Sequence, residues 1–403
     1  MTSGSLVLKN NNGDDLTISA NSTSFTFATA LASGATYAVT AGTRPSRLAC
    51  DITNNTGAIA GTNVTGVTIT CIAPVYVANY GSNTISMYAV NATTGILTAL
   101  TTPTVATGTF PYSIAVNPAG TFAYVVNERG STVSMYAINA ATGILTALTT
   151  PTVATGNEPI TIAINPAGTF AYVTNFNGDT VSMYAINATT GILTALSTPT
   201  VATGNRPITI AINPAGSFAY VTNSGTVSMY AINATTGILT ALVTPTVATG
   251  TNPRSIAVNP AGTFAYVANY GGNTVSMYAI NATTGILTAL ATPTVATGIR
   301  PILIAVNPAG TFAYVANDGS NTVSMYAVNA TTGILTALTT PTVATGNVPS
   351  SIAINPAGTF AYVANEGGST VSMYAINAAT GILTALTTPT VATGNGPLSI
   401  AFK

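Results

Sequence analysis

Short apolar runs alternate with turn-forming polar clusters along the chain from Pro74 onward. One unit shows the pattern: "SIAV" at 113–116, "FAYVV" at 122–126, "TVSMYAI" at 132–138 and "ILTAL" at 144–148. These runs are rich in β-branched and aromatic residues, and the "NPAG" and "NAATG" segments between them hold the Pro, Asn and Gly of tight turns. The runs are apolar on both alternating faces, which is typical of sheets covered by neighbouring sheets. The pattern predicts four-stranded units packed face to face.

The units repeat at a nearly fixed spacing. A Met-Tyr pair appears seven times, but the first unit, from Pro74, lacks the segment that the C-terminal "LSIAF" at 398–402 would supply. If the C-terminal strand pairs with the first unit, the array closes into a ring, and the unpaired strand edges at the two ends of an open array are removed. We expect an all-β, seven-bladed β-propeller over residues 74–403, closed by the C-terminal strand. The phrase "NPAG(T/S)FAYV" begins every 48 residues, with one step of 46, at Asn117, Asn165, Asn213, Asn259, Asn307 and Asn355.

Residues 1–73 follow a different pattern, in which alternating strands are broken by "NNNGDD" and "ASGA". This pattern predicts a small N-terminal β-sandwich. Cys50 and Cys71 are the only cysteines of the chain. A domain of this size buries a marginal core that a disulfide would stabilise, whereas a metal pair would lack any His or further Cys as ligand. We expect a disulfide between Cys50 and Cys71.

Charge is scarce, with eight basic and eight acidic residues, no His and no Trp. A net charge near zero argues against nucleic acid and anionic membrane surfaces as partners, because both require a basic excess. No apolar run approaches the roughly 20 residues of a spanning helix, so no membrane insertion is expected. The opening "MTSGSLVLKN" lacks the regions of a signal peptide, which indicates a mature chain or another export route. A surface built from Ser, Thr, Asn and Gly favours an extracellular or cell-surface location.

The repeated units differ from one another at two places. One place follows "YV(A/V/T)N", and the other brackets the Pro ahead of the first strand of each unit. Both places lie at the same end of the strands in an up-and-down blade, so the sequence predicts one variable face. Two interpretations stay open: free drift of exposed loops, or an interaction surface rich in the Arg and aromatic side chains that dominate contact energies. The candidate binding residues are Tyr80, Phe110, Tyr112, Glu128, Arg129, Glu158, Phe176, Asp179, Arg206, Arg254, Tyr270, Arg300, Asp318 and Glu366.

Hydrolytic chemistry requires a general base and a group that stabilises an oxyanion. The chain has no His, and the carboxylates and arginines of the variable face lie on separate units without a recognised motif. No nucleophile elbow, phosphate loop or calcium loop is present. We therefore expect no catalytic residue, no metal and no cofactor.

The repeats resemble a known family. "FAYVTN" at 170–175 and 218–223, together with "VSMYAIN" and "TTGILTAL", is similar to the YVTN repeat of bacterial and archaeal surface proteins, in the superfamily of seven-bladed lactonase-like propellers. The N-terminal residues resemble the immunoglobulin-like or transthyretin-like modules of bacterial surface proteins. The likeness implies a propeller from Pro74 to Lys403, but propellers host many unrelated activities.

We expect a non-enzymatic extracellular protein of a structural or adhesive kind. It would be a self-assembling surface, filament or matrix subunit, or a protein- or glycan-binding module that uses the variable face. Because a net charge near zero favours self-association, the expected partners are further copies of the chain or an extracellular protein or glycan. The alternative is a lactonase-like hydrolase or small-molecule binder at the central opening of the propeller. Convergence of Glu158, Arg206 and Arg300 within hydrogen-bond reach would favour that alternative.

Overall fold

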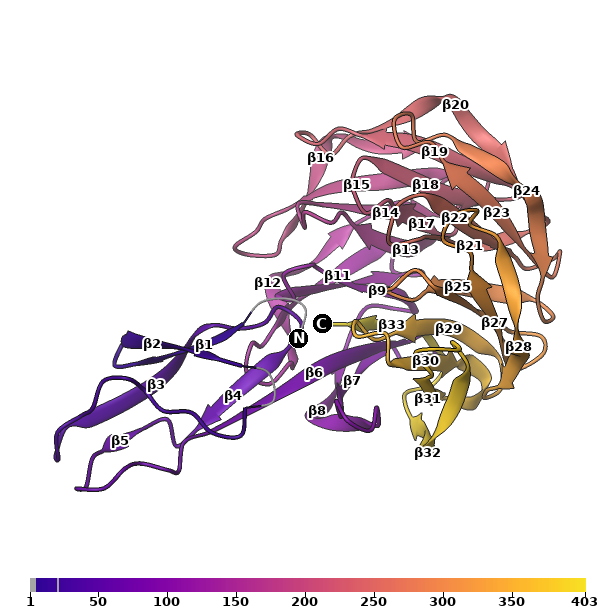
Figure 1. Ribbon diagram of the computed structural model, residues 1–403. Coiled ribbons are helices and arrows are strands. Elements are labelled where there is room, and N and C mark those ends of the chain that lie inside the picture. Colours follow the sequence, from indigo (N-terminus) through magenta and orange to yellow (C-terminus); the bar gives the residue numbers. More distant parts are fainter. Residues whose placement is uncertain (1–4, 20–21) are drawn as a thin grey trace.

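The computed structural model describes residues 5–19 and 22–403. Seven sheets stand around a central axis, and a smaller sheet extends to one side near the N-terminus (Figure 1). The one helical element among the described residues is a 3-10 turn, Glu366–Gly368. The expected all-β, seven-bladed propeller is confirmed. No helix within these ranges is long and apolar enough to cross a membrane.

Each blade is a meander of four antiparallel strands. Blade 2 consists of β9 (Pro111–Val116), β10 (Phe122–Asn127), β11 (Thr132–Ile138) and β12 (Leu145–Ala154), in spatial order from β9 at the inside to β12 at the outside. Strand β10 is buried along its whole length because neighbouring blades pack on both of its faces.

The other complete blades repeat this order. Blade 3 has β13 (Pro159–Ile164), β14 (Phe170–Asn175), β15 (Thr180–Ile186) and β16 (Leu193–Ala202); blade 4 has β17 (Ile210–Ile212), β18 (Phe218–Asn223), β19 (Thr226–Ile232) and β20 (Leu239–Ala248); blade 5 has β21 (Pro253–Val258), β22 (Phe264–Asn269), β23 (Thr274–Ile280) and β24 (Leu287–Ala296); blade 6 has β25 (Pro301–Val306), β26 (Phe312–Asn317), β27 (Thr322–Val328) and β28 (Leu335–Ala344); blade 7 has β29 (Pro349–Ile354), β30 (Phe360–Asn365), β31 (Thr370–Ile376) and β32 (Leu383–Ala392).

The outer strands are longer than their apolar runs predict. The run at 144–148 belongs to β12, which continues to Ala154 through Pro151. The outer half is largely exposed, so no apolar pattern marks it in the sequence. Its Pro is tolerated because an edge strand has one side without ladder hydrogen bonds.

The C-terminal strand closes the ring, as predicted. Strand β33 (Pro397–Phe402) pairs antiparallel with β6 (Thr68–Asn79), with Ile400 opposite Val77. Strands β7 (Thr84–Val90) and β8 (Leu97–Ala106) complete blade 1 in the order β33-β6-β7-β8. The two ends of the propeller segment therefore share one sheet, and each described inner strand has a pairing partner.

Tyrosine hydroxyls join each blade to the next. The Tyr124 hydroxyl of blade 2 donates to the Gly191 carbonyl of blade 3 at 2.8 Å, and the Tyr362 hydroxyl of blade 7 donates to the Gly95 carbonyl of blade 1 at 2.7 Å. The same bond occurs at all seven junctions. Gly191 has φ of 73° and lies against the Phe122 ring, with no room for a Cβ atom. The repeated Tyr and Gly are thus explained by inter-blade packing.

The N-terminal residues form a small sheet and a two-stranded ribbon. Strand β4 (Ala49–Thr53) pairs with the first half of β6, and a disulfide joins the opposed Cys50 and Cys71, as predicted. Because β6 runs unbroken through residue 74, the division of the chain into 1–73 and 74–403 stays a prediction. The sheet has the order β2 (Gly13–Ile18), β1 (Leu6–Asn10), β3 (Thr36–Thr43) and β5 (Thr56–Ala58).

The predicted N-terminal β-sandwich also stays a prediction. A cavity of about 890 Å³ lies between the small sheet and β6, and the Phe25 and Phe27 side chains line it. Leu6, Leu8 and Val39 form the buried core of this region, and the partly buried Ile52 of β4 and Ile69 of β6 pack against it. The two layers therefore share a small apolar core beside the cavity.

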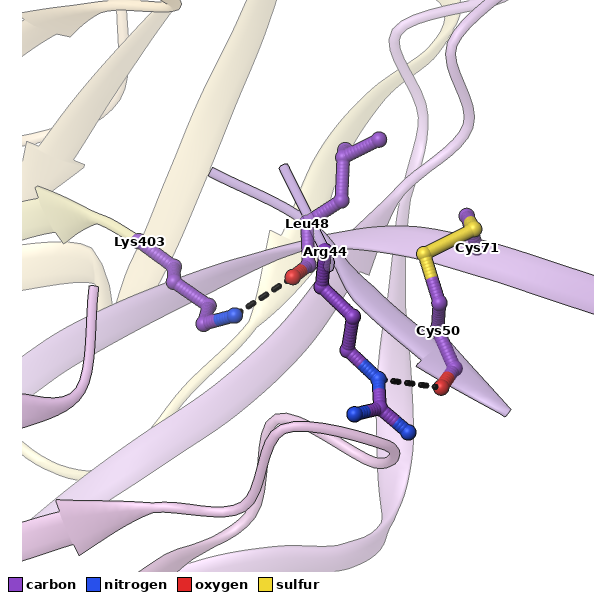
Figure 2. Close-up of a disulfide and its surroundings, with 5 residues drawn as sticks. All are labelled: Arg44, Leu48, Cys50, Cys71 and Lys403. Atoms are coloured by element: carbon purple, nitrogen blue, oxygen red, sulfur yellow. Dashed lines mark hydrogen bonds between the residues drawn. A yellow bond between two sulfur atoms is a disulfide. The ribbon is translucent and has the colours of Figure 1, made fainter. Parts of the chain in front are cut away.

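The N-terminal region contacts the propeller on the face opposite the variable loops. The Lys403 ammonium donates to the Leu48 carbonyl, beside the disulfide (Figure 2). The Cys50 backbone N–H donates to the Ala140 carbonyl, in a blade 2 turn, at 2.9 Å. The contact leaves the variable face uncovered.

Candidate functional site

The inner strands of the seven blades surround the central opening, and each contacts the inner strands of its two neighbours. At one end of these strands, the turn after the second strand lies against the linker that enters the blade. The Glu128 backbone N–H donates to the Phe110 carbonyl at 2.9 Å, and the Asp318 N–H donates to the Arg300 carbonyl at 2.9 Å. The two variable places of each unit therefore meet on one face, which we call the variable face.

Aromatic side chains of blades 1 and 2 form one group on this face. The Tyr80 ring centroid lies 4.6 Å from that of Phe110 and 6.2 Å from that of Tyr112. The Arg129 Cζ atom lies 5.2 Å from the Phe110 centroid, within cation–π distance. Burial, then the hydrogen bond to Glu128 and its negative charge, raises the pKa of Tyr80 to about 12. Its phenol therefore stays protonated at neutral pH.

A second group lies over blades 5 and 6. Two guanidinium groups lie within cation–π distance of the Tyr270 ring, whose centroid is 5.1 Å from Arg254 Cζ and 5.7 Å from Arg300 Cζ. The Tyr270 hydroxyl donates to Asp318 Oδ2 at 3.0 Å. The hydrogen bond to Asp318 fixes the hydroxyl end of the ring. The ring in turn holds Arg254 in place by a cation–π contact.

The two groups approach each other through Tyr112 and Arg254, which follow the linker proline at the start of inner strands β9 and β21. Burial raises the pKa of the Tyr112 phenol, the positive charge of Arg254 lowers it, and the negative charges of Glu128 and Glu366 raise it. Because Coulomb interactions weaken with distance, the side chains that shift this pKa lie near Tyr112. We call Tyr112, Glu128, Arg254 and Glu366 the central cluster; its members come from blades 2, 5 and 7.

Two charged atoms of the central cluster are buried without a hydrogen-bond partner. They are Glu128 Oε2 and Arg254 Nε. A buried polar atom without a partner is costly, and such atoms concentrate where a ligand completes the hydrogen bonding. The central cluster thus offers a free acceptor and a free cationic donor at the centre of the propeller.

Glu366 is the carboxylate of the cluster that is best suited to accept a proton. It begins the turn after β30, and partial burial followed by the negative charge of Asp318 raises the pKa of its carboxyl. A carboxylate with a raised pKa is a stronger base than one in water. The site therefore has a candidate base although the chain has no His.

The remaining candidates of the variable face lie away from the central cluster. Arg206 is exposed, its Cζ lies 5.6 Å from the Phe176 centroid, and its backbone N–H donates to Asp179 Oδ1 at 2.7 Å. Arg300 is exposed, and Glu158 is half-buried on the linker into blade 3. Among the described residues, no hydrogen bond or ion pair joins Glu158, Arg206 and Arg300. The trio that would favour hydrolysis does not converge, and Arg254 takes the central place instead.

The offset around the linker proline explains this difference. Arg206 and Arg300 precede their prolines and have positive φ angles of 53° and 57°, whereas Arg254 follows Pro253 and belongs to the inner strand. At the position of Arg254, the other blades carry Tyr112, Ile160, Ile208, Ile302, Ser350 and Leu398. A comparison of this single position in the repeats would have singled out Tyr112 and Arg254. In the part of the chain that is described, no three His, Cys, Asp or Glu side chains gather as metal ligands.

A family model described as "Lactonase, 7-bladed beta-propeller" matches residues 73–249, 205–300 and 246–402. The chain belongs to this lactonase family. The expectation of a non-enzymatic structural or adhesive protein is therefore wrong, and the match favours the hydrolase alternative. The expectation set the carboxylates aside because they lie on separate units without a recognised motif, although burial and a neighbouring charge adjust a carboxylate for the role of a base.

Solved structures with the same fold include two propellers described as lactonases. A putative 6-phosphogluconolactonase from Bacteroides fragilis is 23% identical, with a TM-score of 0.73 over 82% of this chain and 98% of that chain. The periplasmic gluconolactonase of Pseudomonas aeruginosa is 20% identical, with a TM-score of 0.70 over 82% of this chain and 99% of that chain. At these identities the likeness shows the fold alone. No protein of curated function matches the chain.

Proposed function

We propose that the protein hydrolyses a lactone at the central cluster. The observation that carries this proposal is the pair of buried, unpartnered atoms, Arg254 Nε and Glu128 Oε2, beside Tyr112. Membership of the lactonase family supports the reaction class. The names of the two solved lactonases make a sugar lactone such as glucono-δ-lactone the first substrate to test.

The chemistry of ester hydrolysis assigns a role to each member of the cluster. The Glu366 carboxylate accepts a proton from water while the water oxygen attacks the lactone carbonyl carbon. The Arg254 guanidinium stabilises the negative charge that develops on the carbonyl oxygen. The ring C–O bond then breaks, and the Tyr112 phenol, kept protonated by its raised pKa, donates to the departing alkoxide. The Tyr112 phenolate then takes up a proton from solvent and Glu366 releases the proton it accepted, so both groups return to their starting states. The product is a hydroxy acid, and Glu128 orients the substrate hydroxyls through its free oxygen.

Export of the protein is part of the same proposal. A disulfide persists in oxidising compartments such as the periplasm and the cell exterior. The likeness of the repeats to YVTN surface proteins and the periplasmic location named for the Pseudomonas propeller support this assignment. The expected partners, further copies of the chain or an extracellular protein or glycan, stay predictions.

The test compares lactone hydrolysis by the wild type with that by Arg254→Gln and Glu366→Gln, after subtraction of the spontaneous rate. Loss of an oxyanion donor lowers kcat by about 10²–10³-fold, and loss of a general base lowers it by about 10²–10⁴-fold. Arg129→Gln is the matched control, because Arg129 is an exposed arginine of the same face outside the cluster. Wild-type protein that hydrolyses a panel of sugar lactones no faster than buffer contradicts the proposal.

The pH profile separates the role of Glu366 from that of the other groups. A base acts when deprotonated, and the pKa of Glu366 is raised, so kcat/KM falls on acidification at a pH above the ordinary titration range of Glu. We expect this acid limb to disappear in Glu366→Gln. An acid limb that persists unchanged in that variant assigns the base to another residue.

A further inference from the structure

Blade 4 differs from the other blades at the variable face. Its turn between β18 and β19 consists of Ser224 and Gly225, whereas the corresponding turn of blade 3 has the four residues Phe176–Asp179. Its inner strand β17 covers three residues, whereas β13 covers six. The single 46-residue step of the repeat is therefore a local structural change at the surface.

The short turn leaves a cavity of about 530 Å³ that opens on the variable face. In the other blades, the first turn residue is a large aromatic or acidic side chain, such as Tyr270 or Glu366. Ser224 is too small to fill that place. The lining residues are Arg206, Ser224, Gly225, Thr249, Gly250, Thr251 and Asn252.

The short turn also removes a hydrogen-bond acceptor. In the linkers to blades 4 and 6, the backbone N–H of Arg206 donates to Asp179 at 2.7 Å, and that of Arg300 donates to Asn273 at 2.8 Å. The corresponding N–H in the linker to blade 5 belongs to Asn252, and the matching turn residue is Gly225, which has no side chain. The Asn252 N–H thus lines the cavity without the side-chain acceptor that the N–H groups of Phe110, Arg206, Arg300 and Val348 have.

The cavity has a cation and no carboxylate in its lining. The Arg206 guanidinium is held over the Phe176 ring, at 5.6 Å from its centroid. Within the described ranges the one ion pair is Lys9 with Asp15, so no acidic side chain is paired with Arg206. A guanidinium and a backbone N–H that line one cavity offer hydrogen-bond donors to the two oxygens of a carboxylate. The hydroxyls of Ser224 and Thr251 suit ligand hydroxyl groups.

We propose that this blade 4 cavity binds the carboxylate of a small hydroxy acid. Arg206 and the Asn252 N–H hold the carboxylate, and the neighbouring hydroxyls contact the polyol part. The site lies outside the central cluster, and its occupation does not depend on lactone hydrolysis.

Isothermal titration calorimetry with gluconate tests the proposal, with sorbitol as a neutral polyol of the same carbon number. Replacement of Ser224-Gly225 by Phe-Asn-Gly-Asp, the sequence at 176–179, restores the four-residue turn and fills the cavity. We expect this variant and Arg206→Gln each to weaken gluconate binding by at least about tenfold, since a charge-assisted hydrogen bond contributes about 1.5–3 kcal/mol. Arg300→Gln, in a linker whose turn is complete, is the matched control and retains wild-type binding.

Three outcomes overturn the proposal: unchanged gluconate affinity in the turn-restored variant, unchanged affinity in Arg206→Gln, or sorbitol binding as tight as gluconate binding. Gluconate can also enter the central cluster, so the titrations are repeated with Arg254→Gln, in which the blade 4 site persists. If the turn-restored variant fails to fold by circular dichroism, Arg206→Gln decides the question. Lactonase activity without gluconate binding at blade 4 refutes this site alone, and the reverse result refutes the proposed hydrolysis alone.

Discussion

A shift of two residues, from before the linker proline to after it, decides where an arginine side chain lies on this face. Arg254 follows its linker proline, joins inner strand β21 and has a buried Nε atom. Arg206 precedes its proline, adopts a positive φ of 53° and lies exposed over Phe176. In the proposed reaction, Arg254 stabilises the negative charge that develops on the lactone carbonyl oxygen. In the proposed blade 4 site, Arg206 binds a carboxylate.

Lys403 shows how burial changes a single charge on the opposite side. Its side chain is buried, and it donates to the Leu48 carbonyl beside the disulfide (Figure 2). Burial, followed by the positive charge of Arg44, lowers the pKa of Lys403 from 10.5 to about 8. The protein therefore holds this proton less tightly when folded than when unfolded.

This shift predicts a rise in stability with pH. Between pH 8 and 10.5 the unfolded chain retains a proton that the folded protein has lost, so the free energy of unfolding increases through that window. Chemical denaturation of the wild type and of Lys403→Met at pH 7.5 and 9.0 measures the change. The comparison with Lys403→Met is required because the tyrosines, whose ordinary pKa is 10.0, begin to ionise in the unfolded chain in this range and lower the stability of both proteins. We expect the wild type to gain stability relative to Lys403→Met as the pH rises, and an equal difference at both pH values contradicts the prediction.

At the scale of elements, the blades are held together by repeated buried hydrogen bonds. The Tyr220 hydroxyl of β18 donates to the Gly285 carbonyl of the next blade at 2.9 Å, and the tyrosine is fully buried. A four-stranded sheet cannot cover both of its apolar faces alone, so each blade depends on its neighbours.

Removal of one of these bonds destabilises the propeller. Tyr220→Phe leaves the Gly285 carbonyl buried without its partner, which costs about 1–3 kcal/mol. Tyr270→Phe is the matched control, because it removes one tyrosine hydrogen bond from the partly exposed variable face, with an expected cost of about 1 kcal/mol or less. Denaturant unfolding measures both. Equal losses in the two variants contradict an inter-blade role for Tyr220.

At the scale of the whole molecule, closure of the ring depends on one exchanged strand. Strand β33 comes from the C-terminal end of the chain, and β6 comes from its N-terminal third (Figure 1). The central cluster spans blades 2, 5 and 7, so its geometry requires the closed ring. Stability and the site are therefore coupled through a strand that carries no member of the cluster.

Truncation before Gly396 tests this coupling. The inner edge of β6 would lose its partner, and an unpaired edge favours association between molecules. We expect a lower Tm, oligomers in size-exclusion chromatography and loss of lactone hydrolysis. Addition of a peptide with the sequence of residues 396–403 is expected to restore the Tm. A truncated protein that remains monomeric with an unchanged Tm shows that closure is dispensable.

The sequence by itself determined the blade number, the strand positions, the closure by "LSIAF" and the disulfide. These features follow from the alternation of apolar runs with turn-forming clusters and from the period of the repeat, both of which can be read directly along the chain. The outer half of β12 was not predicted, because its residues are largely exposed and do not form an apolar run.

Only the tertiary structure decided which charged residues meet. The sequence placed all members of the central cluster on the variable face, but it named Glu158, Arg206 and Arg300, and not Arg254, as the residues whose convergence would favour hydrolysis. The ring brings Tyr112 and Arg254 together from blades 2 and 5 and leaves Arg206 exposed at the rim. Convergence across a ring depends on the direction of each side chain at the inner strands, and a repeat period holds no information on that direction. The blade 4 cavity was likewise visible only in the tertiary structure. The sequence shows that the turn is two residues shorter, but the cavity is formed by that turn together with the neighbouring linkers.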